Sequence, residues 1–299
     1  MAFRLIDAAE QAPSDTIAGI YQTFAETTDL LNAIQFDDAP NGAFTYLRPV
    51  DLGNAGFREI NQAFGESTGR MEKIREETFP MGGDADVDKK IVDNDGESLR
   101  GDQESMKLIA MAHLFDYTFI KGDRSSGDNS FTGLQSRLGE VGAGQHFTNG
   151  NGALSFLNLD RVIDSVRGAT HLYMSQEMRR LFDNWVHSSQ NSTVRHTQGE
   201  FRTRVTVYKD LPILEADPND HTMPPLDFLE AGNTTSIYAL NLNPSSGIIA
   251  LQDTDPDVRD LGEVDDAPVY RSRIDWSVGM ALKTQRAAAR LSGITNAAI

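Results

Sequence analysis

The sequence predicts a mixed α+β fold built around one long helix, a projecting β-hairpin and a closing β segment. Residues 98–121 carry apolar side chains at three- and four-residue steps, which is the helical period. Residues 79–91 alternate apolar side chains with charged ones, which is the strand period. After residue 199 the chain consists mostly of β-prone runs. Helical and β segments are therefore mixed along one folded chain.

Composition excludes several classes of protein. The 299 residues contain no cysteine, which excludes disulfides, thiolate metal sites and a cysteine nucleophile. The net charge of −17 argues against a protein that wraps duplex DNA, because phosphate contacts need clustered Lys and Arg. It does not exclude a protein that encloses DNA without gripping it. No apolar run approaches the roughly 20 residues of a membrane span, and the N-terminus becomes acidic too soon for a signal peptide.

The first predicted helix begins after Ser14, which can cap it. Ile17, Ile20 and Phe24 form an apolar stripe at helical spacing. The stripe fits a helix that faces the core, and it also fits an arm that packs on a neighbouring subunit.

Residues 41–92 predict a hairpin that projects from the body. Its first leg is the β-prone run 42–47, and its return leg is the alternating run 79–91. Between them lies a Gly-punctuated stretch whose charges alternate in sign. The segment has too few apolar residues for a core of its own, so its order depends on a partner surface.

The helix over residues 98–121 is bracketed by Gly96 and Gly122 and would be roughly 36 Å long. The remaining elements are expected from local patterns. They are a loop at 121–130, a helix at 134–138, a loop at 139–152, a helix at 159–166, a strand at 169–174, a helix capped by Ser175, a strand at 201–207, an acidic insertion at 218–232, paired strands at 236–242 and 247–251, a strand at 269–282, and a helical or extended segment at 287–294.

The candidate chemical motifs are weak. Asp84, Asp86 and Asp88 have the opening spacing of a calcium loop, but its sixth position is Lys89 instead of Gly and its twelfth is Asp95 instead of Glu. The same alternation explains these carboxylates as the wet face of a strand. We find no zinc-protease, Walker or nucleophile-elbow motif. The sequence therefore predicts no catalytic, cofactor-binding or metal-ligating residue, and no enzyme.

Several stretches, in order and spacing, resemble the major capsid protein of tailed double-stranded DNA bacteriophages, which has the Hong Kong 97-type fold. The stretches are residues 57–69, 82–89, 100–123, 131–134, 159–164, 173–180 and 210–213. The resemblance covers nearly the whole chain. It implies an N-terminal arm at 1–40, an extended hairpin loop at 41–92, a peripheral domain with the spine helix at 93–134 and 256–299, and an α/β axial domain at 135–255.

The resemblance also implies a function. Members of this family form pentamers and hexamers that tile an icosahedral shell around double-stranded DNA. The implied location is the virion capsid, assembled in the host cytoplasm. The implied partners are other copies of the chain, a separate scaffolding protein, a portal and decoration proteins. No cofactor, membrane or sequence-specific DNA contact is implied.

Charged residues of the hairpin are the candidate contacts between subunits, because Arg and Lys can pair with carboxylates across a boundary. The candidates are Arg58, Glu66, Arg70, Glu72, Lys73, Arg75 and Glu76.

Three other functions stay open. An encapsulin-type shell shares the fold but encloses an enzyme cargo. An acidic soluble hydrolase that uses Asp84 or Asp86 would be a compact monomer or dimer with a concave pocket. A tail or decoration protein would bind a shell without closing one.

Overall fold

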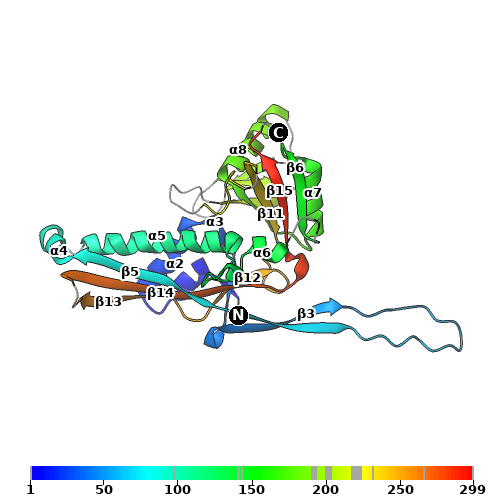
Figure 1. Ribbon diagram of the computed structural model, residues 1–299, viewed down its shortest axis with the longest axis horizontal. Helices are drawn as coiled ribbons and strands as arrows, with labels where there is room; N and C mark the ends of the chain where they lie inside the picture. Colours follow the sequence, from blue (N-terminus) through cyan, green and yellow to red (C-terminus); the bar gives the residue numbers. More distant parts are fainter. Residues whose placement is uncertain are drawn as a thin grey trace.

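The structure is an elongated rod with a lobe standing on it and a narrow hairpin projecting from it (Figure 1). It is a computed structural model that describes residues 2–96, 98–139, 142, 144–189, 194–198, 204–216, 224–230, 232–264 and 267–297. The mixed α+β class predicted from the sequence is confirmed.

The α-helices of the described residues are α1 Leu5–Gln11, α2 Asp15–Thr27, α3 Asp29–Ala33, α4 Lys89–Asp95, α5 Ser98–Lys121, α6 Leu134–Leu138, α7 Phe156–Ser165 and α8 Gln176–Ser189. The short 3-10 helices are η1 Pro40–Gly42, η2 Arg124–Ser126 and η4 Gln285–Ala287. The strands are β1 Phe3–Arg4, β2 Gln35–Asp38, β3 Ala43–Asp51, β4 Arg70–Glu77, β5 Phe79–Asp88, β6 His146–Gly152, β7 His171–Ser175, β8 Val194–Gln198, β9 Arg204–Tyr208, β10 Leu211–Ala216, β11 Thr234–Leu240, β12 Ile248–Gln252, β13 Asp257–Glu263, β14 Val269–Leu282 and β15 Ala288–Thr295.

Two sheets organise the body. The rod contains the order β1-β2-β12-β14-β13, with β5 also paired to β14. The lobe contains the order β6-β15-β11-β7-β10-β9-β8. Strands β3 and β4 form a separate two-stranded sheet, the projecting hairpin. In Figure 1 the hairpin leaves the rod and runs clear of the lobe.

The N-terminal helices pack on the rod of their own chain. Ser14 caps α2, and its Oγ accepts a hydrogen bond from the backbone N–H of Ile17 at 3.3 Å. The predicted apolar stripe turns inward, and the ring of Phe24 stacks on Trp276 of β14 with centroids 4.9 Å apart. The core-facing interpretation of this stripe is therefore confirmed. Helix α1 and strands β1 and β2 were not predicted.

Helix α5 is the spine of the rod and has the predicted bounds. Its buried face includes Leu108, Met111, Phe115 and Phe119. The ring of Phe115 lies 6.2 Å from that of Trp276, centroid to centroid, which joins the helix to the sheet. Gly122 follows the helix, and a side chain there would collide with the backbone oxygen of Phe131. The close approach of that neighbouring segment therefore requires glycine at this position.

The return leg of the hairpin is not the strand that the sequence predicts. The predicted leg forms β5 and pairs antiparallel with β14, with Phe79 opposite Val278 and Asp88 opposite Val269. The charged run Arg70–Glu77, expected as the middle of the loop, forms β4 and pairs with β3. Alternation identifies a strand but not its partner, since all strands share the same period.

The lobe buries one face of its sheet under α7 and α8. The predicted cap of α8 is present, with Ser175 Oγ accepting from the N–H of Met178 at 3.3 Å. Leu172 of β7 packs toward these helices, whereas Tyr173 turns to the opposite face. Tyr173 Oη donates a hydrogen bond to Asp116 of α5 at 2.6 Å. This buried contact joins the lobe to the spine helix.

Three predictions about the C-terminal half need correction or completion. Strands β11 and β12 were expected to pair, but β11 pairs with β15 and β7 in the lobe, and β12 with β14 and β2 in the rod. The expected loop at 139–152 contains β6, which pairs in parallel with β15. The segment 287–294, open as helical or extended, is strand β15. The domain boundary at residue 255 remains a prediction. It assigns β12 to the axial domain and β15 to the peripheral domain, whereas β12 lies in the sheet of the rod and β15 in the sheet of the lobe.

The described residues contain no helix with both the length and the hydropathy needed to cross a membrane. Within the same residues, no cluster of three or more His, Asp or Glu side chains could hold a metal ion. The strand predicted from residue 201 is described from Arg204 onward, as β9. Residues 199–203 and 217–223, which carry parts of that strand and of the acidic insertion, lie outside the described residues.

Candidate assembly interface

The hairpin has two faces of different chemistry. Its register places Tyr46 opposite Ile74 and Leu47 opposite Lys73, so alternate pairs point to opposite sides. The inner face carries Phe44, Tyr46 and Arg48 from β3 with Glu72, Ile74 and Glu76 from β4. The outer face carries Thr45, Leu47 and Pro49 with Met71, Lys73 and Arg75.

The inner face fixes the root of the hairpin to the body. Tyr46 Oη donates a hydrogen bond to the backbone oxygen of Leu282 at 2.7 Å, and burial raises the pKa of Tyr46 to about 12. The carboxylate of Glu76 accepts two hydrogen bonds from Arg137, at 2.6 and 2.9 Å. Both of these side chains are only 16% exposed. A bidentate pair at this depth holds both strands at one angle to the body.

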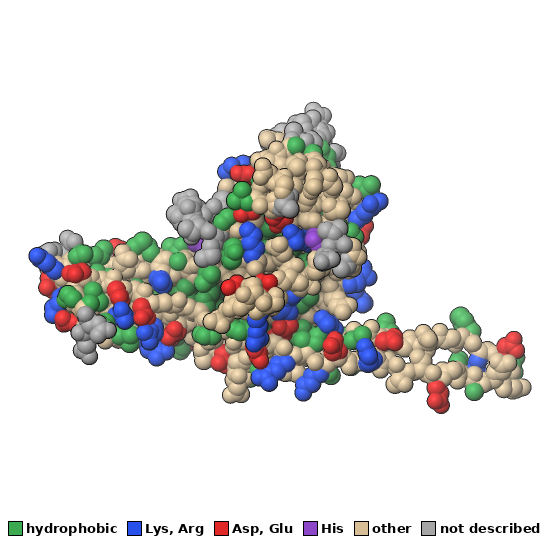
Figure 2. Space-filling view, viewed as in Figure 1, with side chains coloured by type: hydrophobic (Ala, Val, Ile, Leu, Met, Phe, Trp, Pro, Cys, Tyr) green, Lys and Arg blue, Asp and Glu red, His purple; other side chains and the backbone are tan. Residues whose placement is uncertain are grey.

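The outer face and the tip are left uncovered by this chain. Leu47 and Met71 on the outer face are 62% and 65% exposed. At the tip, Phe57 and Ile60 are almost fully exposed, and Phe64 is 64% exposed. Figure 2 shows green apolar side chains at the far end of the hairpin, with no other part of the chain beside them. Exposed apolar side chains gathered on one projecting element are typical of an interaction surface.

The tip has local order without a core. The backbone N–H of Asn54 donates to Ser67 Oγ at 2.6 Å, which closes the base of the tip. The Arg58 guanidinium lies 5.0 Å from the centre of the Phe64 ring and donates to the backbone oxygen of Gln62. These short contacts give the tip a shape but leave its apolar side chains in water.

Two of the predicted contact residues are used within the chain. Glu76 is bound to Arg137, as described above. Glu72 lies opposite Arg48, and Arg48 Nη2 donates to its carboxylate at 3.4 Å. Both acidic residues lie on the inner face, but only Glu76 is held in the root, since the side chain of Glu72 is 57% exposed.

The other five candidates lie on the uncovered surface. Lys73 and Arg75 project from the outer face beside Leu47 and Met71. Arg75 has one weak ion pair, with Glu77 at 3.9 Å. The last three candidates lie at or beside the tip and are Arg58, Glu66 and Arg70. Across the residues that the structure describes, none of these three has an ion pair, and neither does Lys73.

Sequence reasoning missed the residues that hold the root. Tyr46 carries a detectable signal, because it alternates with exposed residues in a β-prone run. Arg137 carries none, since its partner Glu76 lies 61 positions away in sequence. Arg124, which pairs with Glu77 at 2.9 Å, lies 47 positions from its partner.

Two aspartates of the weak calcium motif, Asp84 and Asp86, are paired with arginines, and the third, Asp88, caps α4. Asp84 accepts two hydrogen bonds from Arg273 at 2.7 and 2.9 Å, and Asp86 two from Arg271 at 2.6 and 2.7 Å. Hydrogen bonds from these guanidinium groups lower the pKa of both carboxyl groups. The pairs run across β5 and β14 on the face of the sheet that is turned away from α5. The interpretation of these carboxylates as the wet face of a strand is therefore confirmed.

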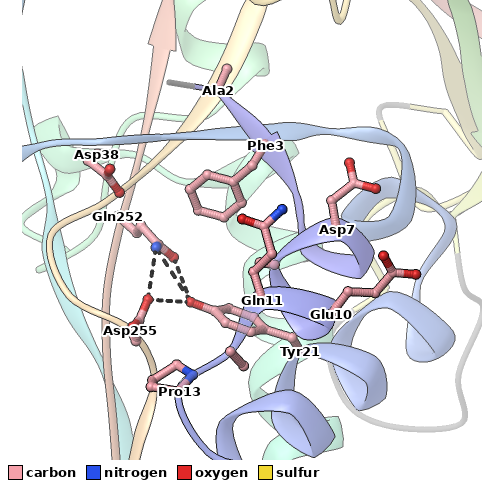
Figure 3. A pocket seen from close by; sticks show the side chains of 12 residues that line it. Ala2, Phe3, Asp7, Glu10, Gln11, Pro13, Tyr21, Asp38, Gln252 and Asp255 are labelled. Carbon is pink, nitrogen blue, oxygen red and sulfur yellow. Dashed lines mark hydrogen bonds between the residues drawn. The ribbon is translucent and has the colours of Figure 1, made fainter.

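A cavity of about 580 Å³ lies beneath the N-terminal segment (Figure 3). Tyr21 Oη donates to Asp255 at 2.7 Å, and Gln252 Nε2 donates to the same carboxylate at 3.3 Å. Burial raises the pKa of Tyr21 well above its usual value. Phe3 and Pro13 form an apolar part of the cavity wall. Tyr21, Gln252 and Asp255 bond to one another and tie α2 to the end of β12, which is a structural arrangement.

A family model supports the resemblance seen in the sequence. The model for the major capsid protein GP7 matches residues 12–158, just under half of the chain. That segment includes α2, the hairpin, β5, α5 and the start of the lobe. No curated protein sequence matches the chain.

Solved structures share the fold over most of the chain. The holo-SrpI encapsulin complex from Synechococcus elongatus matches with a TM-score of 0.67 and 16% identity, over 89% of this chain and 87% of that chain. A structure of Mycobacterium phage Adephagia matches with a TM-score of 0.65 and 12% identity, over 90% and 89%. The capsid of an empty GTA particle matches with a TM-score of 0.62 and 14% identity, over 90% of each chain.

The family and these folds are those of structural shell proteins, not of enzymes. Each of these matches covers 89–90% of this chain, so the likeness is one of the fold as a whole. The chain therefore has the Hong Kong 97-type capsid fold of these solved structures, and residues 12–158 match the model of the major capsid protein GP7 family.

Proposed function

We propose that the chain assembles through pentamers and hexamers into the icosahedral head shell of a tailed bacteriophage that encloses double-stranded DNA. Its location is then the virion, after assembly in the bacterial cytoplasm. The match to a major capsid protein family supports this proposal. The hairpin, fixed at its root and uncovered beyond it, is the single structural observation that carries it.

The uncovered hairpin needs a partner on energetic grounds. Burying one Phe, Leu or Ile side chain is worth roughly 1.5–3 kcal/mol. Leu52, Phe57, Ile60 and Phe64 together would then contribute roughly 6–12 kcal/mol when covered, as an upper bound. A two-stranded hairpin alone is marginal in water, so this gain favours an ordered, covered hairpin. A second copy of the chain is the partner that a shell supplies.

The five uncovered candidates supply the polar rim of this contact. Arg58, Arg70, Lys73 and Arg75 are cations, while the chain as a whole has a net charge of −17. Each copy therefore presents an excess of carboxylates to the hairpin of the next copy. Charge complementarity of this kind sets the register and the rate of association more than the affinity.

The division into arm, hairpin loop, peripheral domain and axial domain belongs to the same proposal. So do a separate scaffolding protein, a portal and decoration proteins as partners. One structural neighbour, the satellite phage P4 procapsid, includes a size determination protein, and matches with a TM-score of 0.54 and 10% identity over 93% of this chain. The acidic charge of this chain suits a wall that encloses DNA without binding its sequence.

The second candidate function is an encapsulin-type shell around a protein cargo. The likeness to the encapsulin complex, over 89% of this chain, is the observation that favours it. The match to the GP7 family over residues 12–158 favours the phage head instead. Particles purified from expressing cells separate the two, because a phage head packages nucleic acid and a nanocompartment packages protein.

Assembly of the purified chain tests the shell itself. Size-exclusion chromatography and negative-stain electron microscopy should show capsomer-sized rings or closed shells. The triple variant Phe57→Ser, Ile60→Ser, Phe64→Ser should keep its fold, because all three side chains are exposed, and should lose assembly. Leu157→Ser is the matched control, since Leu157 is 63% exposed but lies on α7, outside the hairpin. A chain that stays monomeric with scaffolding and portal proteins supplied contradicts the proposal.

A further inference from the structure

A second cavity lies at the inner corner between the hairpin and the lobe. It has a volume of about 580 Å³ and is lined by Arg48, Arg137 and Arg286, with Gln145, Leu138 and Leu282 also in its wall. Arg48 comes from β3, Arg137 from α6 and Arg286 from η4 below the lobe. Three parts of the molecule therefore meet around one cationic recess. In Figure 2 basic side chains gather along the edge of the body from which the hairpin leaves.

The three guanidinium groups differ in how far their charge is balanced. Arg137 is paired with Glu76 and donates also to the backbone oxygen of Thr132. Arg48 has only a longer contact, 3.4 Å, to the exposed carboxylate of Glu72. Arg286 Nε donates to the backbone oxygen of Ser165 at 2.8 Å.

The recess is left with unfilled hydrogen-bonding capacity. No carboxylate of the described residues lies within ion-pair distance of Arg286, whose side chain is exposed. Arg48 Nε is buried without a hydrogen-bond partner there. A buried donor without an acceptor is costly. An anionic group that enters the recess would pair with the guanidinium charges and accept a hydrogen bond from Arg48 Nε.

The position of the recess indicates what fills it. Its wall is formed by Arg48 of the hairpin, Arg137 of α6 and Arg286 of η4, which leads into β15 of the lobe. A second copy that covers the inner side of the hairpin beyond its root must occupy the same corner. A chain of net charge −17 brings carboxylates there. Its wall is also partly apolar through Leu138 and Leu282, which suits the methylene groups of an acidic side chain better than the continuous charged backbone of a nucleic acid.

We propose that this cavity, called the corner site, binds a carboxylate side chain of a second copy of the chain. The inference rests on the proposed shell function and deepens it by naming a cationic site that binds acidic groups of the partner. Because the corner site touches both the hairpin and the lobe, an inserted carboxylate would hold the angle between them as subunits join. Arg286 is the residue whose pairing is made only in the assembly.

The test compares assembly of Arg286→Glu, Arg286→Gln and wild-type chains by light scattering and electron microscopy over a range of protein concentrations. Arg161→Glu is the matched control, because Arg161 is also exposed but lies on α7. We expect Arg286→Glu to raise the concentration for half-assembly at least about tenfold, or about 1.4 kcal/mol per contact. Arg286→Gln should show a smaller rise, and the control none. Circular dichroism should show all four chains folded alike.

Two results overturn the inference while the proposed function stands. In one, wild-type and Arg286→Glu chains assemble at concentrations within twofold of each other. In the other, Arg286→Glu assembles normally but loses co-purifying nucleic acid, measured by the absorbance ratio at 260 and 280 nm, which assigns the site to phosphate. If the wild-type chain itself forms no shell with scaffolding and portal proteins supplied, the proposed function fails, and the inference fails with it.

Discussion

Replacing Arg137 with glutamine should release the root of the hairpin from the body. The change removes a bidentate partner of Glu76 and a donor to the backbone oxygen of Thr132. The carboxylate of Glu76, only 16% exposed, would be left without its cation. The inner face keeps the hydrogen bond from Tyr46 to Leu282 and the packing of Phe44 and Tyr46 on the body, but neither supplies a cation for this carboxylate.

The expected magnitude follows from the depth of the pair. Removing one partner of a buried ion pair costs about 3–5 kcal/mol. The pair here is partly exposed, and Glu76 can reach water when the hairpin swings out, so we expect about 2–3 kcal/mol. Each 1.4 kcal/mol is tenfold in an equilibrium constant. The opening equilibrium of the hairpin should therefore rise roughly a hundredfold.

Hydrogen exchange measured by mass spectrometry on the unassembled chain reads this opening directly. Peptides from β3 and β4 should lose roughly two orders of magnitude of protection, while peptides from α5 and β14 keep theirs. Arg161→Gln on α7 is the control for losing a surface arginine. Unchanged protection of β3 and β4 in Arg137→Gln would refute the assignment of this pair as the clamp of the hairpin.

Three further predictions concern pH, metal and packing. Burial lowers the pKa of His171 to about 4 in the folded chain, so between pH 6.5 and 4 the unfolded chain binds one proton more than the folded chain. The free energy of unfolding should therefore fall by about 2–3 kcal/mol as the pH drops through this window. Urea titrations should show that His171→Gln loses this part of the pH dependence. Calcium should leave the melting temperature unchanged, because Asp84 and Asp86 are already paired with arginines; a rise of several degrees that Asp84→Asn abolishes would restore the calcium interpretation. Gly279→Ala should destabilise by about 1–3 kcal/mol in urea unfolding, since its Cβ would lie 2.7 Å from the backbone oxygen of Glu77 at the end of β4. Gly19→Ala, in open space on α2, should be neutral or stabilising. Equal effects of the two substitutions would contradict the packing described here.

Local periodicity predicted the helices and strands whose signal is contained in their own residues. The bounds of α5 and the caps Ser14 and Ser175 are of this kind, since one apolar stripe or one hydroxyl defines them. Pairing between strands was not predictable in the same way. Strand β4 has only Met71 and Ile74 as apolar residues, three positions apart, so it carries no alternating signal, and the alternation of β5 does not indicate that its partner is β14.

The candidate interface was predictable in outline but not in its division into two faces. Its charged residues stand out in the sequence because few apolar residues accompany them. Which of them meet a cation of their own chain depends on register, and Glu76 meets Arg137 only after α6 has folded against the root. The corner site depends on three separate elements, so no local pattern in the sequence indicates it.

The central claim is that the uncovered hairpin is covered by a second copy in a closed shell. An electron cryo-microscopy map of assembled particles tests it most directly. The account predicts closed shells in which Phe57, Ile60 and Phe64 of each hairpin are buried against a neighbouring copy. Closed shells whose hairpin tips contact nothing, or particles that form equally well after these three residues are changed to serine, would contradict it.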